Sequence, residues 1–344
     1  MDSTLSDSNT ASTPAVTFVL PTLNAAGSLF ERALQSIRGQ DYPQERVEVI
    51  VADGGSSDAT RATAEGFGAR VIGNPNRLAE WGVKEGILVA SGEIVVIFAA
   101  DNELVDGGWL RRVTGRFATD ADVAACYGRL VSGSDDPPLN KYQALIQSEP
   151  LNWFLNRNLE TYLAGRAPGH DGGIAFSVDP ARPLVWGANG LALRADWVRS
   201  IWGRPGYVAD TDAFHELIRS GRDRVVYFPG PYCYHHQVAS LSDMRRKWLR
   251  NSRDHLLGQG EARDLDWVLV PGFRRRAVLW MIYSLVPVFS VADAVRRAVG
   301  DRSPYWLYHP VASLLQALTY VEVVIGTPAG RRFLSRTLIK RPPA

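Results

Sequence analysis

The sequence has few cysteines and few lysines, and both shortages narrow the kind of protein it can be. Its 344 residues include two cysteines, Cys126 and Cys233, too few for a disulfide scaffold or a cysteine-rich zinc module. The count fits a reducing compartment. Only four of the 38 basic residues are lysines, which we attribute to genome composition. Apolar residues make up 46% and charged residues 22%, so the chain is neither disordered nor collagen-like.

Several familiar sequence patterns are also missing. No glycine fingerprint of a dinucleotide-binding fold follows the first apolar run, where the sequence reads PTLNAAG, and no Walker loop occurs. NAD and P-loop chemistry are therefore disfavoured. Residues 1–14 are rich in Ser, Thr and Asp and lack the basic and apolar regions of a secretory signal. We expect a disordered tail there and a chain that starts in the cytoplasm.

Charge is unevenly distributed, although the net charge is only +2. Residues 245–344 carry 17 basic and 7 acidic residues, a net charge of +10, whereas residues 1–244 carry −8. An acidic body with a basic, apolar C-terminal region is typical of a surface that faces phosphates or anionic lipid. Nucleic acid is disfavoured as a partner, because the basic residues stand among long apolar runs instead of the patterns of nucleic-acid modules.

Short apolar runs alternate with amphipathic segments through the first hundred residues. Strands are predicted at 16–20, 47–52, 70–72 and 94–99, and helices at 29–37 and 78–89. This alternation indicates an α/β fold with a mainly parallel sheet. The first and last of these strands lack polar alternation, so both of their faces are expected to be covered.

Polar residues gather where three of these strands end. The residues at the ends are Pro21, Thr22 and Asn24 after the first strand, Asp53 and Gly54 after the second, and Ala100, Asp101 and Asn102 after the fourth. In open α/β sheets, ligands bind outside the carboxyl ends of the strands. The three ends therefore predict a single binding site.

These segments together resemble the inverting family-2 glycosyltransferases, enzymes with the GT-A nucleotide-sugar-binding fold. The resemblance covers residues 16–255 and is carried by VTFVLPTLN, QDYPQERVEVIVADGGSSDAT, residues 92–103, WGANGLALR and residues 210–221, in that order. It implies a donor-binding half at 15–125 and an acceptor half at 126–255. The remaining residues, 256–344, are predicted from their own apolar stretches to form a separate helical, membrane-associating region.

The resemblance implies a UDP- or GDP-sugar donor and a divalent cation, Mn²⁺ or Mg²⁺. It assigns the strand-end residues to the donor, with Asp53 on the nucleobase and Asp101 on the metal. His235 is assigned to the metal as well, with His236 as the alternate and a purely structural histidine as the competing interpretation. A hard cation with oxygen ligands neutralises a diphosphate as its bond to the sugar breaks.

One departure from the family pattern lies in the metal-binding turn. The segment that would hold an Asp-x-Asp motif reads Ala99-Ala100-Asp101, so the first acid is absent. One carboxylate with diphosphate oxygens and water is enough to hold such a cation, and we expect Asn102 and Glu103 to compensate in part. The departure leaves a degenerate, non-catalytic nucleotide-sugar-binding scaffold as an alternative.

The catalytic base implied by the resemblance is Asp210, with Asp212 as the alternate, in the segment ADTDAFHELIRSG. A carboxylate is suited to removing the proton of an attacking hydroxyl. An acid at the start of an amphipathic helix is also typical of a helix cap, which is the competing interpretation.

Two further segments are assigned to the acceptor or to a phosphate. One is the loop that holds Trp186 and Asn189, which is otherwise a plain turn. The other is a basic helix at 241–251, which is otherwise a solvated face. The residues singled out in this helix are Arg246, Lys247, Trp248 and Arg250.

The C-terminal region contains two apolar stretches with arginines on their flanks. Ala277–Ala292 has 16 residues without a charge and is interrupted by Pro287; as a helix it spans roughly 24 Å, less than the roughly 30 Å of bilayer hydrocarbon. Tyr305–Gly326 is longer but contains polar residues. Soluble core helices, a monotopic pair and a two-span hairpin all remain open; basic flanks favour the monotopic form.

The sequence thus predicts a metal-dependent inverting glycosyltransferase at the cytoplasmic face of the plasma membrane. The acceptor is expected to be a hydroxyl of a lipid-linked or cell-envelope glycan, and transfer to polyprenyl phosphate is the alternative within this class. A nucleotidyltransferase is disfavoured, because no Gly-rich basic triphosphate loop follows the first strand. A homodimer is another use for the apolar C-terminal faces.

Overall fold

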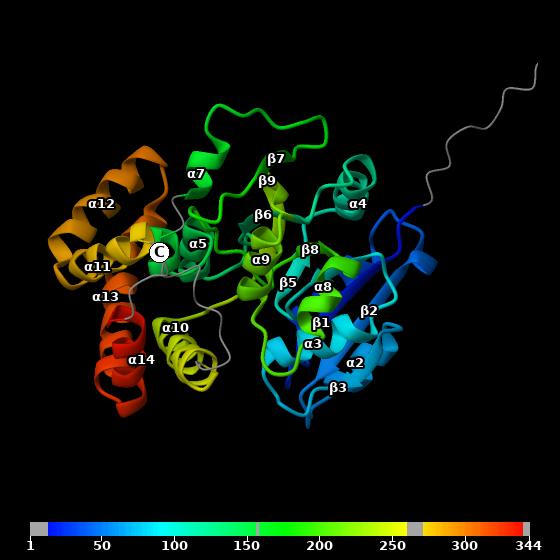
Figure 1. The fold of residues 1–344 in the computed structure, drawn as a ribbon, viewed down its shortest axis with the longest axis horizontal. Helices are drawn as coiled ribbons and strands as arrows, with labels where there is room; N and C mark the ends of the chain where they lie inside the picture. The colour runs from blue at the N-terminus through cyan, green and yellow to red at the C-terminus, as the bar shows by residue number, and fades with distance from the viewer. Residues whose placement is uncertain (1–12, 156–157, 260–270, 340–344) are drawn as a thin grey trace, which may run out of the picture.

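A mixed β-sheet forms the centre of the molecule, and the C-terminal helices pack beside it (Figure 1). The computed structural model describes residues 13–155, 158–259 and 271–339. The strands are β1 Val16–Thr22, β2 Val47–Asp53, β3 Arg70–Gly73, β4 Ile94–Ile97, β5 Asn102–Leu104, β6 Ala125–Val131, β7 Ile174–Ser177, β8 Leu191–Arg194 and β9 Arg224–His235.

Helices connect the strands and form the whole C-terminal region. They are α1 Ser28–Arg38, α2 Thr60–Gly66, α3 Ala79–Val89, α4 Trp109–Thr119, α5 Pro138–Ile146, α6 Pro150–Leu155, α7 Asn158–Leu163, α8 Ala195–Trp202, α9 Asp210–Arg219, α10 Leu241–Arg250, α11 Pro271–Leu285, α12 Pro287–Gly300, α13 His309–Tyr320 and α14 Pro328–Ile339. Shorter turns are η1 Gln44–Arg46, η2 Asn251–Leu257, η4 Pro304–Tyr308 and η5 Val321–Ile325.

The strand order across the described sheet is β3-β2-β1-β4-β8-β6-β9-β5, with β7 also paired to β9. The parallel arrangement predicted for the first four strands is confirmed, since β1 pairs in parallel with both β2 and β4. Beyond β4 the sheet is mixed: β8 runs antiparallel to β4, whereas β6 and β9 are parallel to each other. The α/β class and the C-terminal helical extension are as predicted.

Both faces of β1 are covered, which explains its unbroken run of apolar residues. Phe18 and Leu20 point to one face and pack with α1 and α4, while Val19 points to the other and packs with α3, α8 and α9. On the first face the rings of Phe18 and Phe98 meet edge to face, with their centroids 5.6 Å apart. Alternate side chains of one strand therefore anchor two separate helical layers.

The C-terminal helices pack against α5 and α6 through an aromatic cluster. His309, at the start of α13, is fully buried, and its Nδ1 lies 2.8 Å from the hydroxyl of Tyr142 on α5. Its ring centroid is 4.7 Å from that of Trp153. Burial lowers the pKa of His309 to about 4, so the ring is neutral at neutral pH. This cluster places α13 firmly against α5 and α6.

The last two residues of the predicted disordered tail are ordered, which corrects the boundary of that prediction. Residues 1–12 of the predicted 1–14 tail lie outside the described residues, as do 260–270 and 340–344 of the predicted C-terminal region. Thr13 and Pro14 are held in place, since their carbonyls accept hydrogen bonds from Arg46 and Tyr42. The predicted interruption at Pro287 is confirmed as a 92° bend between α11 and α12.

Close packing of α3 on β1 yields a prediction about stability. A Cβ atom added to Gly86 would lie 2.3 Å from Val19 Cγ1. We expect Gly86→Ala to lower the free energy of unfolding by about 1–3 kcal/mol, because the helix must move off the strand. The matched control is Gly115→Ala in α4, where nothing lies within 4 Å of the added atom. That change should be neutral or stabilising, and urea denaturation of both variants compares them. Equal stability of the two variants would contradict the expectation.

Candidate functional site

The loops after β1 and β2 are joined by hydrogen bonds at the carboxyl edge of the sheet. The carboxylate of Asp53 is buried and accepts from the backbone N–H groups of Gly55, at 3.2 Å, and Ser56, at 3.1 Å. Asn24 adopts a left-handed conformation with φ of 50°, and its Oδ1 accepts from the N–H of Ser57 at 2.8 Å. Asp53 and Asn24 therefore shape the predicted donor loop, whatever ligand they contact.

Buried polar atoms with unused hydrogen-bonding capacity line this edge. Thr22 Oγ1, opposite Asp53 in the β1–β2 register, finds no hydrogen-bond partner among the described residues, and neither does Asn74 Oδ1. The backbone N–H of Asn74 donates to the Asp53 carbonyl at 2.8 Å. Orphaned buried polar atoms are costly, so a ligand at this edge has groups to satisfy. Our sequence analysis missed Asn74, although it directly follows the predicted third strand.

A close backbone approach also explains Gly54. A Cβ there would lie 3.3 Å from the Thr22 carbonyl oxygen and 3.5 Å from the Cα of Arg77. Arg77 itself has a left-handed φ of 61°. The turn after β3 therefore brings an exposed arginine beside the predicted donor loop. Our sequence analysis did not single out Arg77.

Asp101 and His235 meet in the turn that follows β4. Asn102 opens β5 and pairs with His235 at the end of β9, so the two chain segments run side by side. Asp101 Oδ1 lies 3.7 Å from His235 Nε2. Burial lowers the pKa of His235 to about 4, with the charge of Asp101 acting in the opposite direction. The ring is therefore neutral at neutral pH and its nitrogen is available to a cation.

This pair fits the predicted cation as part of a ligand set. A carboxylate oxygen and a neutral imidazole nitrogen are both ordinary ligands of Mn²⁺. The described residues contain no cluster of three or more His, Cys, Asp or Glu side chains that could hold a metal by themselves. The remaining ligands would have to come from a bound diphosphate and water.

The side chains expected to replace the missing acid are engaged elsewhere. Asn102 is fully buried and its Oδ1 accepts from the N–H of Ala99 at 2.8 Å, which closes the turn. Glu103 forms an ion pair with Arg32 and lies 3.4 Å from Nε2 of His236. Their expected compensation therefore has no support in the geometry.

His236, the alternate metal ligand, belongs to this second network. Its Nδ1 lies 2.7 Å from Asp136 Oδ1, and its side chain is 5% exposed. The amide of Asn140 joins the network by donating to Asp136 at 2.8 Å. Of the two adjacent histidines, His235 is the one that faces Asp101, while His236 is used in packing β9 against α5.

The predicted basic helix contributes one cation to the site. Lys247 on α10 is half-buried; burial lowers its pKa, and the negative charges of Asp101 and Glu149 oppose that shift. Arg246 is exposed and pairs with Asp243 at 3.2 Å. The ammonium group of Lys247 is therefore the basic group of α10 that shares its surroundings with the Asp101–His235 pair.

Two tryptophans assigned to acceptor or phosphate contact are core residues, which corrects that prediction. Trp186 is 1% exposed and stacks against Tyr127, with ring centroids 5.3 Å apart. Trp248 is also 1% exposed and belongs to the cluster that holds α10 against α5 and α13. Neither indole ring can reach a ligand from these positions; each fixes the backbone beside the site. Arg250 is exposed on the surface of α10.

The loop that follows Trp186 brings Asp210 to the same edge of the sheet. The N–H of Gly190 donates to the Ile97 carbonyl at 2.9 Å, which ties the loop to the end of β4. A Cβ on Gly187 would lie 2.8 Å from Asp210 Oδ2, so the carboxylate lies directly over this glycine. Asn189 is half-buried in this loop, and its backbone N–H donates to the Gly187 carbonyl at 2.8 Å.

Burial separates the two candidate bases. Asp210 is the first residue of α9 and is half-buried, with its Oδ1 accepting from the N–H of Thr211 at 2.8 Å. Asp212 is 6% exposed and lies in the buried face of the same helix. Access therefore favours Asp210 as the carboxylate that can meet a substrate.

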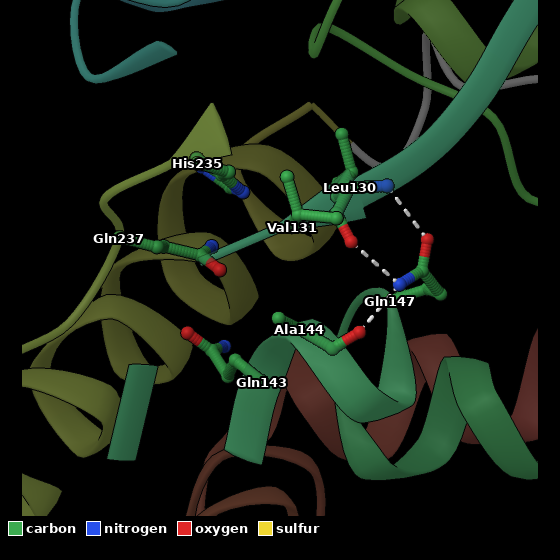
Figure 2. A pocket seen from close by; sticks show the side chains of 7 residues that line it. All are labelled: Leu130, Val131, Gln143, Ala144, Gln147, His235 and Gln237. Carbon is green, nitrogen blue, oxygen red and sulfur yellow. Dashed lines mark hydrogen bonds between the residues drawn. The ribbon is translucent and has the colours of Figure 1, made fainter. Parts of the chain in front are cut away.

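A small hollow lies beside His235, between the end of β6 and α5 (Figure 2). Gln147 closes one side of it: its Oε1 accepts from the Leu130 N–H at 2.8 Å and its Nε2 donates to the Leu130 carbonyl at 2.9 Å. The hollow has room for about one water molecule and is too small for a sugar.

Comparison with solved structures defines the fold class. A mannosyltransferase from Pyrobaculum calidifontis, solved with GDP-Man and Mn²⁺, is 17% identical with a TM-score of 0.52, over 90% of this chain and 87% of its own. Glucosyl-3-phosphoglycerate synthase from Mycobacterium tuberculosis is 18% identical with a TM-score of 0.46, over 77% of this chain and 80% of its own. The first of these likenesses identifies the fold as GT-A.

A comparison with protein families gives a match in the N-terminal part of the sequence. Residues 17–179 match the model of glycosyl transferase family 2, a range that contains the Asp53 and Asp101 turns. No curated protein gives a significant match. Residues 17–179 therefore carry the sequence pattern of glycosyl transferase family 2, and the fold of the chain is GT-A.

The position of Lys247 yields a prediction about phosphate binding. We expect Lys247→Met to weaken binding of UDP or GDP in the presence of Mn²⁺ by about tenfold or more, the effect of losing one charge-assisted contact of about 1.4 kcal/mol. Arg246→Met is the matched control, because Arg246 is the exposed neighbour on the same helix. Calorimetric titration of both variants distinguishes them. Equal loss in both would show that only the overall charge of α10 matters.

Proposed function

We propose that this glycosyltransferase takes its sugar from a UDP- or GDP-sugar with the help of Mn²⁺ or Mg²⁺. It transfers the sugar, with inversion, to a hydroxyl of a lipid-linked or cell-envelope glycan at the cytoplasmic face of the plasma membrane. The observation that carries the proposal is the gathering of the Asp53 turn, the Asp101–His235 pair and Asp210 at one sheet edge. The mannosyltransferase of the same fold, solved with GDP-Man and Mn²⁺, supports this donor class.

The donor nucleotide would lie across the ends of β1, β2 and β3. Thr22 Oγ1 and Asn74 Oδ1 offer unused hydrogen-bonding capacity there, and the preformed Asp53 turn holds its carboxylate in one orientation. Such preorganisation lowers the entropy cost of binding a flexible nucleotide. The Asp53 carboxylate already accepts from Gly55, Ser56 and Arg61, so its part would be to hold the turn at which the family resemblance implies the nucleobase contact.

The diphosphate would lie toward the Asp101 turn. Asp101 and His235 are the residues that would hold the cation, whose chemistry is to neutralise the leaving diphosphate. Lys247 adds a positive charge that the protein supplies itself. Partial burial strengthens this attraction relative to that of an exposed lysine.

The acceptor would approach over the 186–190 loop. Asp210 is placed to take the proton of the attacking hydroxyl, and its position at the N-terminus of α9 stabilises the carboxylate form. A direct displacement by the acceptor oxygen inverts the anomeric centre and needs no covalent intermediate.

The donor proposal predicts a nucleotide-specific stabilisation. With UDP, GDP, CDP and dTDP tested with and without Mn²⁺, we expect UDP or GDP to raise the melting temperature of the folded protein in a metal-dependent manner. Asp101→Asn should abolish the metal-dependent part. No shift with any nucleotide would overturn the donor proposal. Binding without turnover of any sugar donor would support the degenerate scaffold instead.

The assignment of the base predicts a large kinetic effect. Asp210→Asn should lower the rate of transfer to a hydroxyl acceptor by about 10²–10⁴-fold without changing nucleotide-induced stabilisation. Asp196→Asn is the matched control, since Asp196 lies in the first turn of α8 and is 88% exposed. A near-normal rate in Asp210→Asn would favour polyprenyl phosphate as the acceptor, because an ionised phosphate needs no base.

A further inference from the structure

The corner formed by α11 and α12 exposes its apolar side chains and buries its serines. From Val278 to Val295 the exposed large side chains are all apolar: Val278, Leu279, Ile282, Leu285, Val286, Val288, Phe289, Val291 and Val295. The serines of the same stretch, Ser284 and Ser290, are fully buried. A water-exposed helix normally points its serines outward and its valines inward. We call this set of exposed side chains the apolar corner.

Nine of the nineteen exposed large apolar side chains in the described part of the chain belong to the apolar corner. Val288 is 65% exposed and Phe289 is 54% exposed, on either side of the bend. In the N-terminal half of the described chain, exposed large apolar side chains are limited to two short pairs, Leu23 with Leu29 and Leu88 with Val89. Contiguous exposed apolar surface of this kind marks an interaction site.

The shape of the apolar corner favours lipid acyl chains over a rigid protein as its binding partner. α11 and α12 meet at 92° next to Pro287, so the apex projects as a convex wedge at one end of the molecule (Figure 1). A rigid protein partner or a second copy would need a matching hollow, whereas acyl chains adapt to a wedge. No helix in the described ranges is long and apolar enough to span a bilayer alone.

Charges are placed around the corner in a way that suits one anionic leaflet. No charged residue occurs between Arg276 and Asp293, so the apex can leave water without desolvating a charge. Arg275 and Arg296 are exposed at the two ends of this interval. Arg296 pairs with Asp293 at 2.6 Å and keeps 68% of its side chain open to headgroup phosphates. Basic residues close to an anionic membrane surface each contribute about 1 kcal/mol of attraction.

We propose that the apolar corner inserts into one leaflet of an anionic membrane and holds the enzyme there without spanning it. The inference rests on the proposed function only in assigning the cytoplasmic side of the membrane. The docking surface itself follows from the exposed side chains of the apolar corner. The lipid class required is an anionic phospholipid, and the depth is that of an interfacial helix pair.

A series of packing contacts and hydrogen bonds connects the apolar corner with the candidate active site. α11 and α12 both pack on α13. Gln316 of α13 donates to Glu149 at 2.7 Å, and the Tyr320 hydroxyl donates to the same carboxylate. The charge of Glu149 in turn acts on Lys247. Membrane docking would therefore fix the active-site edge relative to the lipid surface, where a lipid-linked acceptor resides.

The test is co-sedimentation of the full chain, without detergent, with vesicles of phosphatidylcholine alone or mixed with phosphatidylglycerol. We expect the wild type to pellet with mixed vesicles and to be released by detergent more fully than by salt. The double variant Val288→Glu with Phe289→Glu should bind at least about tenfold more weakly. Leu88→Glu with Val89→Glu is the matched control, a second exposed apolar pair outside the corner.

Each result has a defined meaning. Binding by the corner variant at the wild-type level, or a wild type that stays in the supernatant, would overturn the proposal. A wild-type dimer that becomes monomeric in the corner variant, measured by light scattering, would overturn it in favour of a self-association surface. Circular dichroism and UDP or GDP thermal shifts of the variants confirm an intact fold and donor site. If the wild type binds the mixed vesicles but neither it nor any variant binds UDP or GDP, the proposed function is wrong and the membrane proposal stands.

Discussion

The pairing of β5 with the end of β9 is the contact on which the site depends. It joins residues more than 130 positions apart, setting Asn102 opposite His235, and thereby places Asp101 beside an imidazole. The buried amide of Asn102 closes the turn, and the His236 N–H holds the Asp101 carbonyl at 2.9 Å. Without this three-residue ladder, one carboxylate would stand alone after β4. An alanine can therefore stand at residue 99, where the Asp-x-Asp motif has its first acid, because the strand pairing holds Asp101 in position.

The C-terminal helices serve the catalytic half in two ways. Their inner surface closes an aromatic core around His309, and through Glu149 it reaches Lys247 at the candidate diphosphate position. Burial raises the pKa of Glu149, while its nearby lysine has the pKa lowered by the same effect. Two half-buried ionisable groups of opposite sign are retained here at a cost in desolvation. Such a cost is typical of groups kept for function, and the outer surface of the same helices is the apolar corner.

Much of the fold was predictable from local pattern. Unbroken apolar runs located β1 and β4, and the polar residues after β1, β2 and β4 identified the ligand edge, because strands of a parallel sheet end together. Pro287 marked the break between α11 and α12. The errors concern side chains whose surroundings come from distant segments. Trp186 and Trp248 look like ligand-stacking residues in sequence, but Tyr127 and Tyr142, about 60 and 100 positions earlier, bury them. Asn74 and Arg77 were missed because a polar turn after a short strand is common.

The amino-acid order by itself determined the class of fold, the strand ends that carry the site, the uneven charge and the apolar C-terminal stretch. These are local properties, readable from periodicity and composition. Only the tertiary structure decided which of two adjacent histidines faces Asp101, which of two aspartates in α9 is accessible, and which face of α11 and α12 is turned outward. A shift of one residue along a strand, or of two along a helix, leaves the sequence pattern almost unchanged, yet it reverses burial, because it turns the side chain to the opposite face.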